Sequence, residues 1–425
     1  MNDMSTIFQR LLDRETSVAV IGLGYVGAPV ALEFSKIFNV IAYDISESRV
    51  NHLRDECVHL SQSLNVTSSD SALDDASLFI VTVGTPVDRY MRPDLSQLMS
   101  ATRTVGLHLQ LGDYVVYEST VYPGCTESEC VPLLEKISGL RCGIDFKVGY
   151  SPERINPGDS AHTLSNTPKV VSGIDKAATE ELQKIYGYVI TAGVHAASSI
   201  KVAEASKIVE NVQRAVNIAL VNELSALFSH MGMSLRKVLD LASTKWNFSS
   251  YAPGLVGGHC IPVDPYYLIS EARHWGMDLP LIKYSCVVND GMSDYIARSV
   301  LDRIDLSRPK PAKALIMGVT YKDNSDDIRN PAVFRLRELL MAGGVAIDLV
   351  DPHADMANVK KVFGVDMSSN ICPPYNVVIV TVGHSDFLDL DENYFLSITI
   401  DKDALLADLK GIYRGRIKNM KYWTL

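Results

Sequence analysis

The sequence lacks any apolar run near the ~18 residues that a transmembrane helix requires. Its first 17 residues are polar and mixed in charge, without the apolar core of a signal peptide. Lysine and arginine form no cluster, and the 425 residues carry 40 basic against 50 acidic side chains, a net charge of −10. We therefore expect a cytoplasmic protein that binds neither membranes nor nucleic acid. An anionic substrate would need a locally basic pocket.

Cysteine is scarce, odd in number and scattered. No two cysteines have CxxC spacing, so the sequence predicts neither a metal site nor a disulfide framework. The chain length predicts two or three domains. A hydrophobic content of 47% and a charged content of 21% are ordinary for a globular protein. The seven residues are Cys57, Cys125, Cys130, Cys142, Cys260, Cys286 and Cys372.

One of these cysteines lies in a loop rich in glycine and proline. Cys260 follows Gly257 and Gly258, and Asp264 comes four residues later. A thiol beside a carboxylate suits covalent catalysis on a carbonyl, with the acid group handling water or protons. The alternative is a buried structural cysteine and a turn-forming aspartate, which is the commoner case for a lone cysteine.

The strongest cofactor motif stands near the N-terminus. A buried strand at 17–21 is followed by a GxGxxG motif at 22–27, a helix at 28–38, a second strand and then Asp44. This order is typical of a dinucleotide site, where glycines let the backbone approach a pyrophosphate at a helix N-terminus. Asp44 would bind both ribose hydroxyls and repel a 2′-phosphate, which favours NAD over NADP; Arg49 is the residue that could reverse this choice.

Polar residues follow three further predicted strands, at 78–83, 114–117 and 146–150. Each group stands just beyond the carboxyl end of its strand, where an open parallel α/β sheet binds its ligand. A single such group is usually a turn or a helix cap, but three at one edge favour a site. The groups contain Thr85, then Glu118, Ser119 and Thr120, then Glu153 and Arg154.

Residues 198–230 contain neither glycine nor proline, which predicts one long helix. Lys207 and Asn211 are four residues apart and share a helix face. They could be part of a solvated stripe. However, apolar residues occupy most sides of the helix, which indicates burial in a core or in a dimer interface. A buried lysine and asparagine would then need partners.

The clearest domain boundary is the proline-rich linker at 307–311. Beyond it, strands at 313–318, 346–350 and 377–382 and a helix at 333–342 predict a second α/β domain. This domain has no glycine fingerprint, so we expect a different ligand in the same kind of crevice. The sequence shows no internal repeat.

These motifs, in this order, resemble those of the UDP-glucose/GDP-mannose dehydrogenase family, over about residues 18–387. The resemblance implies two Rossmann-like doubly wound α/β domains joined by a long central helix: an NAD-binding domain at 1–197, a helical dimerisation domain with the cysteine loop at 198–306, and a UDP-sugar-binding domain at 307–425. It implies a homodimer that uses NAD in a four-electron oxidation of the sugar C6 hydroxyl. The matching segments are 22–27, 118–121, 151–153, Lys207 with Asn211, 222–224, 257–268, and Lys322 with 326–329.

By resemblance, Cys260 is the nucleophile that forms a thiohemiacetal and then a thioester. Lys207 and Asn211 stabilise the C6 oxygen, Asp264 and Thr120 position a water, and Glu153 is the acid/base for thioester hydrolysis. The chain departs from some family members at Pro157, where they carry a second glutamate, so Glu153 should do more of the proton transfer. The expected cofactor-binding residues are Gly22, Gly24, Tyr25, Val26, Gly27, Asp44, Arg49, Thr85 and Thr120. The expected substrate-binding residues are Glu153, Arg154, Lys207, Asn211, Lys245, Gly257, Lys322 and Arg329.

The segments at 151–158 and 245–248 resemble the branch that oxidises UDP-N-acetylglucosamine or UDP-N-acetylgalactosamine for surface polysaccharides. UDP-N-acetylmannosamine and UDP-glucose are the alternative substrates. Two other classes stay open. A two-electron 3-hydroxyacid dehydrogenase would need neither Cys260 nor the last domain. An NAD-responsive binding protein would have no use for Cys260, Lys207, Asp264 and Glu153 together.

Overall fold

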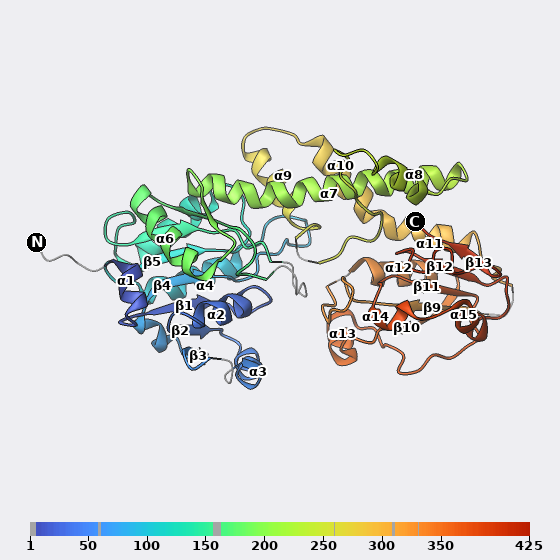
Figure 1. Cartoon of the computed structure of the whole chain (residues 1–425), viewed down its shortest axis with the longest axis horizontal. Helices are drawn as coiled ribbons and strands as arrows, with labels where there is room; N and C mark the ends of the chain where they lie inside the picture. The colour runs from blue at the N-terminus through green and yellow to red at the C-terminus, as the bar shows by residue number, and fades with distance from the viewer. Residues whose placement is uncertain (1–5, 58–60, 156–162, 259, 308–310, 330) are drawn as a thin grey trace, which may run out of the picture. The chain divides into compact units, whose positions relative to one another are not determined.

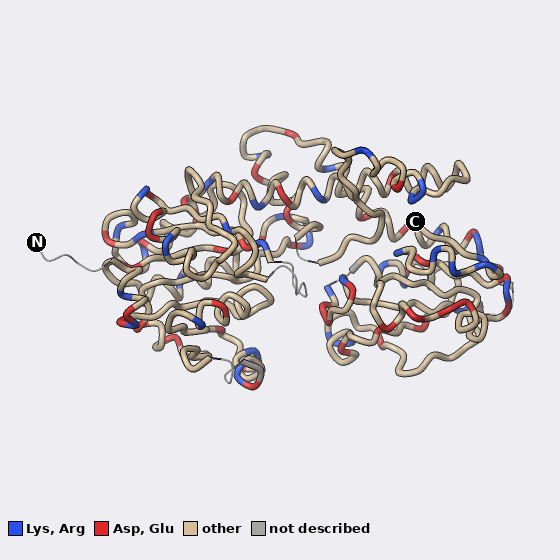
Figure 2. Tube along the Cα trace, in the orientation of Figure 1, with Lys and Arg blue, Asp and Glu red and all other residues tan. Residues whose placement is uncertain are grey.

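The computed structural model of the chain describes residues 6–57, 61–155, 163–258, 260–307, 311–329 and 331–425 (Figure 1). It divides into two compact units. The first contains residues up to Asn211 together with Tyr266–Asp278, and the second contains Val212–Pro265 and Leu279–Leu425. No helix in the described residues is long and apolar enough to cross a membrane. Basic and acidic residues are interspersed along both units (Figure 2).

The first unit is built on an eight-stranded sheet with the order β3-β2-β1-β4-β5-β6-β7-β8. The first six strands are parallel and have the order of a dinucleotide-binding fold, with the reversal between β1 and β4. The strands are β1 Ser17–Ile21, β2 Val40–Tyr43, β3 Leu64–Thr67, β4 Ala76–Val81, β5 Tyr114–Tyr117, β6 Lys147–Tyr150, β7 Lys169–Gly173 and β8 Val194–Ala196.

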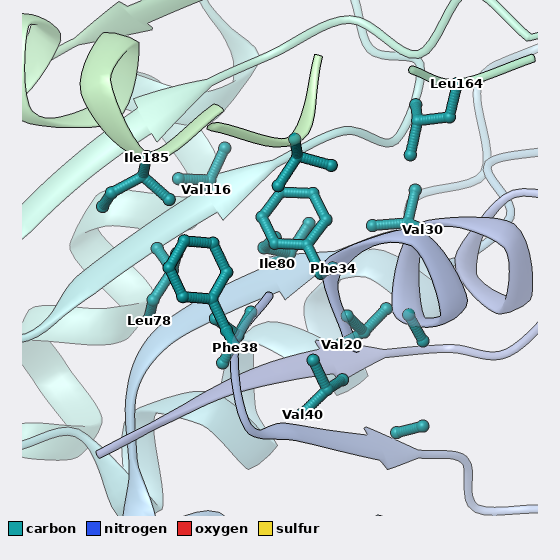
Figure 3. Close-up of a cluster of buried hydrophobic side chains, with 14 of the residues drawn as sticks. Val20, Val30, Phe34, Phe38, Val40, Leu78, Ile80, Val116, Leu164 and Ile185 are labelled. Atoms are coloured by element: carbon teal, nitrogen blue, oxygen red, sulfur yellow. The ribbon is translucent and has the colours of Figure 1, made fainter. Parts of the chain in front are cut away.

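Both faces of this sheet are buried, as expected for parallel strands with helical crossovers. In β1, Val18 and Val20 belong to one apolar cluster, whereas Ala19 and Ile21 belong to another. Figure 3 shows Phe34 of α2 among the side chains of the first cluster. The helical segments of this part are α1 Ile7–Leu12, α2 Gly27–Ser35, α3 Glu47–Cys57, the 3₁₀ helix η1 Asp70–Asp75, α4 Ser96–His108, the π-helical η2 Thr126–Cys130, α5 Val131–Ser138 and α6 Lys176–Val189.

Strand β7 runs against its neighbour β6. The antiparallel register pairs Gly149 with Gly173 and Tyr150 with Ser172. An antiparallel strand begins where its neighbour ends. The first residue of β7, Lys169, is therefore brought to the carboxyl edge of β5 and β6.

Helix α7 Ile200–His230 has 31 residues and contributes to both units (green in Figure 1). Its buried residues include Ala203, Ile208, Val212 and Ala219. It is followed by shorter helices, α8 Leu235–Ala242, α9 Asp264–His274, α10 Pro280–Asp290 and α11 Met292–Leu301.

The second sheet, in the second unit, has five parallel strands in the order β10-β9-β11-β12-β13. Its two faces are also both buried: Ala314 and Ile316 of β9 pack in one cluster, and Leu315 and Met317 in another. The elements are β9 Ala312–Met317, α12 Pro331–Ala342, β10 Val345–Val350, α13 Met356–Phe363, β11 Val377–Val380, α14 Ser385–Leu388, α15 Glu392–Ile398, β12 Leu405–Asp408 and β13 Lys421–Trp423.

The α/β class and both parallel sheets were predicted correctly. The largest error in the predicted bounds is at the end of α2, and several other ends differ by two residues. The helix after the glycine motif begins at Gly27 and ends at Ser35 rather than spanning 28–38. Strand β4 ends at Val81 because the next residue, Thr82, turns its hydroxyl back to the carbonyls of Ile21 and Gly22. The domain boundaries 1–197, 198–306 and 307–425 stay a prediction.

Candidate active site

The glycine motif makes a tight turn between β1 and α2. Gly22 has φ +94°, a conformation that side chains with a Cβ rarely adopt. A Cβ at Gly27 would lie 1.8 Å from the carbonyl oxygen of Gly22, so this position can hold only glycine. At Gly24 no atom lies within 4 Å of a built Cβ. The turn is therefore closed on its protein side and open at Gly24, as a backbone that receives a pyrophosphate requires.

The carboxylate of Asp44 stands at the end of β2 beside this turn. Its Oδ2 accepts from the Leu23 N–H at 2.8 Å and its Oδ1 from the Ser46 N–H at 2.9 Å. Arg49 donates from Nε to the Leu23 carbonyl at 2.6 Å, so it holds the glycine turn. Arg49, the residue that could have favoured NADP, is thus hydrogen-bonded to the backbone of the glycine turn.

A cavity of about 540 Å³ opens at the reversal of strand order between β1 and β4. Gly22, Gly24 and Asp44 line it, together with Thr82 and Gly84 from the end of β4. Of the other expected cofactor residues, Thr85 is buried, and its hydroxyl donates to the carbonyl of Thr120 at 2.6 Å. Tyr25 and Val26 lie in the turn just before α2, and Val26 is the N-cap of that helix. These features fit a bound dinucleotide.

Three ionisable side chains meet at the carboxyl edge of β5, β6 and β7. Lys169 Nζ lies 2.8 Å from Glu118 Oε2 and 2.5 Å from Glu153 Oε2, and all three side chains are buried. Tyr186 of α6 donates to the other oxygen of Glu118 at 2.5 Å. Burial raises the pKa of Glu118 to about 7 against the opposing effect of Lys169. Burial acts in the same way on Glu153, but the charge and hydrogen bond of Lys169 hold the pKa of that carboxyl below its usual range.

Helix α7 brings its polar face to the same edge. Lys207 is half-buried and donates from Nζ to the main-chain carbonyl of Glu153 at 2.6 Å. Asn211, one turn later, is buried. Arg154 donates to the Pro168 carbonyl and pairs with Glu210 of α7. In the first unit, therefore, Lys207 lies at the main chain of Glu153, and Arg154 lies at Glu210 of the same helix.

The predicted nucleophile lies in the second unit. Cys260 is exposed, and its carbonyl accepts from the N–H groups of Val263 and Asp264, the latter at 2.8 Å. Asp264 is the first residue of α9 and is buried. The loop is anchored at Gly258, whose N–H donates to the Arg329 carbonyl at 2.7 Å.

The remaining expected substrate residues are also in the second unit. Gly257 is half-buried in the cysteine loop. Arg329 is half-buried and pairs with the buried Asp327. Lys322 is half-buried in the turn after β9, and Lys245 is exposed. Cys260 and Asp264 belong to the second unit, whereas Lys207, Asn211, Thr120 and Glu153 belong to the first. Their meeting in one site stays a prediction, and Pro157 lies outside the described residues.

The sequence reasoning missed two members of the buried cluster. Lys169 was not considered, although a lysine at the start of the apolar run 169–171 is unusual for a sheet interior and could have drawn notice. Tyr186 was not considered either. Glu118 was noted only as part of a polar group after a strand.

The fold and the cavity define an NAD-binding α/β protein. Comparison with known proteins gives its family. Three consecutive parts of the chain match the UDP-glucose/GDP-mannose dehydrogenase family: its NAD binding domain at 16–190, its central domain at 201–291 and its UDP binding domain at 315–415. The chain belongs to this family and is an NAD-dependent nucleotide-sugar dehydrogenase. This decides against a 3-hydroxyacid dehydrogenase and against a mere binding protein.

Individual relatives agree with this assignment. Protein CapL of Staphylococcus aureus is 43% identical over 96% of this chain and 99% of its own. The UDP-N-acetyl-D-glucosamine 6-dehydrogenase of Pseudomonas aeruginosa is 43% identical over 89% of this chain and 92% of its own. Among solved structures, the UDP-D-ManNAc dehydrogenase of Pyrococcus horikoshii has a TM-score of 0.86 at 28% identity, covering 96% of this chain and 99% of that chain.

Proposed function

We propose that this enzyme oxidises the C6 hydroxyl of a UDP-N-acetylhexosamine to the carboxylate, for the synthesis of surface polysaccharide precursors. The observation that carries the four-electron reaction is the exposed thiol of Cys260 in an anchored loop, with the buried Asp264 one helical turn away. Two relatives named UDP-N-acetyl-D-glucosamine 6-dehydrogenase, at 43% and 40% identity, favour UDP-N-acetylglucosamine. Two relatives named UDP-N-acetyl-D-mannosamine dehydrogenase are each 30% identical.

The reaction balances as one alcohol, two NAD⁺ and one water giving one carboxylate, two NADH and three protons. NAD, when bound by the glycine turn and Asp44, supplies the hydride acceptor for both oxidations. In the first oxidation the C6–H bond breaks and the hydroxyl proton leaves, which gives an aldehyde. The Cys260 thiolate then adds to the aldehyde carbon to form a thiohemiacetal.

The thiohemiacetal then loses the C6 hydride and its hydroxyl proton, which forms a thioester. Water held by Asp264 and Thr120 attacks this thioester, the carbon–sulfur bond breaks and the thiol is restored. Glu153 accepts the proton of the water. Lys207 and Asn211 bind the C6 oxygen wherever it carries negative charge, as donors in an oxyanion site. Arg154, Lys245, Gly257, Lys322 and Arg329 contact the nucleotide sugar.

The assembly that we propose is a homodimer in the cytoplasm, with α7 in its interface. Val202, Val209, Leu220 and Leu227 are between 50% and 58% exposed. Their spacings of 7, 11 and 7 residues place them on one side of the helix. Such a stripe on a long helix is suited to a two-fold interface. Sedimentation as a monomer at every concentration would contradict this arrangement.

The covalent step is tested by Cys260→Ser, with Cys372→Ser as the matched control because Cys372 is also exposed. Serine is a far weaker nucleophile at neutral pH, so uronic acid formation should fall by about 10³-fold or more while NAD still binds. Cys372→Ser should keep wild-type turnover. Lys207→Ala should slow both oxidations, measured in single turnovers. Wild-type turnover to acid by Cys260→Ser would return Cys260 to a structural role.

The substrate is tested by NADH release and product mass on a panel of UDP-N-acetylglucosamine, UDP-N-acetylgalactosamine, UDP-N-acetylmannosamine and UDP-glucose. We expect the highest kcat/KM with UDP-N-acetylglucosamine, two NADH per sugar and no free aldehyde. Preference for UDP-glucose would refute the hexosamine assignment and leave the chemistry intact.

A further inference from the structure

The buried cluster at the edge of the first sheet joins residues that are far apart in the chain. Glu118 follows β5, Glu153 follows β6 and Lys169 opens β7. The antiparallel register pairs Tyr150 with Ser172, and extending it by three residues in each strand sets Glu153 opposite Lys169. The ion pair at 2.5 Å is therefore a product of strand pairing.

Burying this cluster is costly unless every charge has a partner. The side chains of Lys169 and Glu118 are 2% and 0% exposed, and that of Glu153 is 6% exposed. Burial alone would lower the pKa of Lys169, but the two carboxylates raise it above its usual value. Lys169 is a buried cation between two carboxylates, and it lies at the edge where a parallel sheet binds its ligand. This combination points to a role beyond stability.

The link to the reaction is Glu153, which is held at both ends. Its Oε2 binds Lys169, while its Oε1 accepts from the N–H groups of Arg154 and Ile155 at 2.6 Å each. The side chain thus closes a tight turn on its own backbone. The carbonyl of the same residue accepts the hydrogen bond from Lys207.

We propose that Lys169 is a positioning residue of the reaction: by fixing the Glu153 carboxylate it sets the direction of the Glu153 carbonyl and, through it, the place of the Lys207 ammonium. This rests on the proposed function of Lys207 at the C6 oxygen. The Lys207 ammonium has three N–H donors on a flexible side chain. One of them must bind a fixed acceptor if the other two are to point in a defined direction. Lys169 also keeps Glu153 ionised and ready to accept a proton.

The first variants are Lys169→Met and the double variant Lys169→Met with Glu118→Gln. The single variant leaves two buried carboxylates without a cation and can fail to fold; the double variant removes one of these charges. A misplacement near 1 Å costs about 10²-fold in rate, so we expect kcat of the double variant to fall by about that factor, with the KM for NAD within ~3-fold. Glu118→Gln alone keeps the pair of Lys169 and Glu153 and should stay within ~3-fold of wild-type kcat.

The pH profile of kcat separates positioning from a merely structural role. The charged and titratable groups that face Glu153 and Lys169 are Glu118 of the β5 end, Tyr186 of α6 and Lys207 of α7. Without Lys169, burial raises the pKa of Glu153. The acidic limb of the kcat profile should therefore move to higher pH in the double variant. Lys169→Arg keeps the charge and should restore most of the activity at neutral pH.

Lys147→Met is the control for loss of a sheet lysine. Lys147 of β6 pairs with Asp175 at 2.6 Å and with the Gly143 carbonyl, away from Glu153. The Lys147→Met variant should have a lower melting temperature than the wild type, with an unchanged kcat and an unchanged pH profile of kcat. The proposal is overturned if the double variant matches Glu118→Gln in kcat and pH profile, or if Glu118→Gln alone loses activity. Failure of the proposed function would instead show as an inactive wild type on every UDP-sugar.

Discussion

The first turn of each parallel sheet has the same hydrogen-bonding plan. After β1, Gly22 has φ +94°, and after β9, Gly318 has φ +102°. In the first sheet Thr82, at the end of β4, donates to the Gly22 carbonyl, and Asp44 accepts from the next N–H. In the second sheet the residues at the corresponding places do the same. Thr381 donates to the Gly318 carbonyl, and Asp351 accepts from the N–H of Val319 at 2.7 Å.

The two turns differ at the points that a ligand would reach. The second residue after the first glycine is Gly24 in the first sheet, with open space around it, and the buried Thr320 in the second. Asp44 is half-buried at the cavity. Asp351 is also half-buried as a residue, but its side chain is fully buried, with Oδ2 3.1 Å from His384 Nε2.

The same turn geometry therefore occurs in both sheets, but its carboxylate is exposed to a different degree in each. The carboxylate at the end of the second strand holds the turn in both domains, but only Asp44 is also open to a ribose. In the second sheet the Asp351 carboxylate is covered by His384. The Nδ1 of this histidine accepts from the Asn324 N–H at 2.9 Å, and Asn324 lies in the turn that carries Lys322. The turn after β9 therefore does not present its Asp351 carboxylate to a ribose as the turn after β1 presents Asp44.

The largest expected effect concerns Gly27. Gly27→Ala would set a Cβ 1.8 Å from the Gly22 carbonyl and 2.4 Å from Thr82 Oγ1, so the turn cannot keep its shape. We expect a loss of about 4 kcal/mol or more in the free energy of unfolding of the first unit, measured by urea denaturation. In Gly24→Ala the added Cβ has no protein atom within 4 Å, so this variant should keep the wild-type stability. It should nevertheless bind NAD more weakly. Equal stability of the two variants would contradict this.

The next effect concerns the open carboxylate. Asp44→Ala removes a charged acceptor for the ribose hydroxyls and the repulsion of a 2′-phosphate. We expect the Kd for NAD to rise by about 10²-fold, near 2.7 kcal/mol, and NADP to be used relatively better. Titration with both cofactors measures this. Asp351→Ala, the corresponding change in the second domain, should leave the NADP to NAD ratio unchanged, and a wild type that uses both cofactors equally would refute the assignment.

The smallest effect concerns the sealed carboxylate. Burial raises the pKa of Asp351, but hydrogen bonds from His384 and backbone N–H groups outweigh this and lower it to about 2. A lowered pKa stabilises the fold above the unfolded value near 4, and this contribution is lost as pH falls from about 4 to about 2. It amounts to about 2 kcal/mol. Asp351→Asn should unfold more easily than wild type at pH 5, with the gap closing by pH 2; a gap independent of pH would contradict this.

Sequence reasoning succeeded where structure and signal are local. The strand, the three glycines and Asp44 lie within 28 residues, and Gly22 and Gly27 each have a steric cause. It failed to see the repeated turn because the second copy has Thr320 where the first has Gly24, so the glycine pattern is absent. The same geometry is held there by the side chains of Thr381 and Asp351, which lie far from Gly318 in the sequence.

The buried cluster was missed for a different reason. Lys169 and Glu118 are 51 residues apart, and their contact depends on the order of β5, β6 and β7 and on the reversal of β7. A single sequence gives the strands but not their order. The pairing of Glu118 and Glu153 with one cation could be predicted only after the sheet was known.

The reversed strand β7 also limits how the chain can change in evolution. Side chains alternate across a sheet, so a one-residue deletion within Val170–Gly173 would slip the pairing and turn Lys169 to the opposite face. Glu118 and Glu153 would then be left buried without their cation. We therefore expect insertions and deletions to be excluded from this short strand.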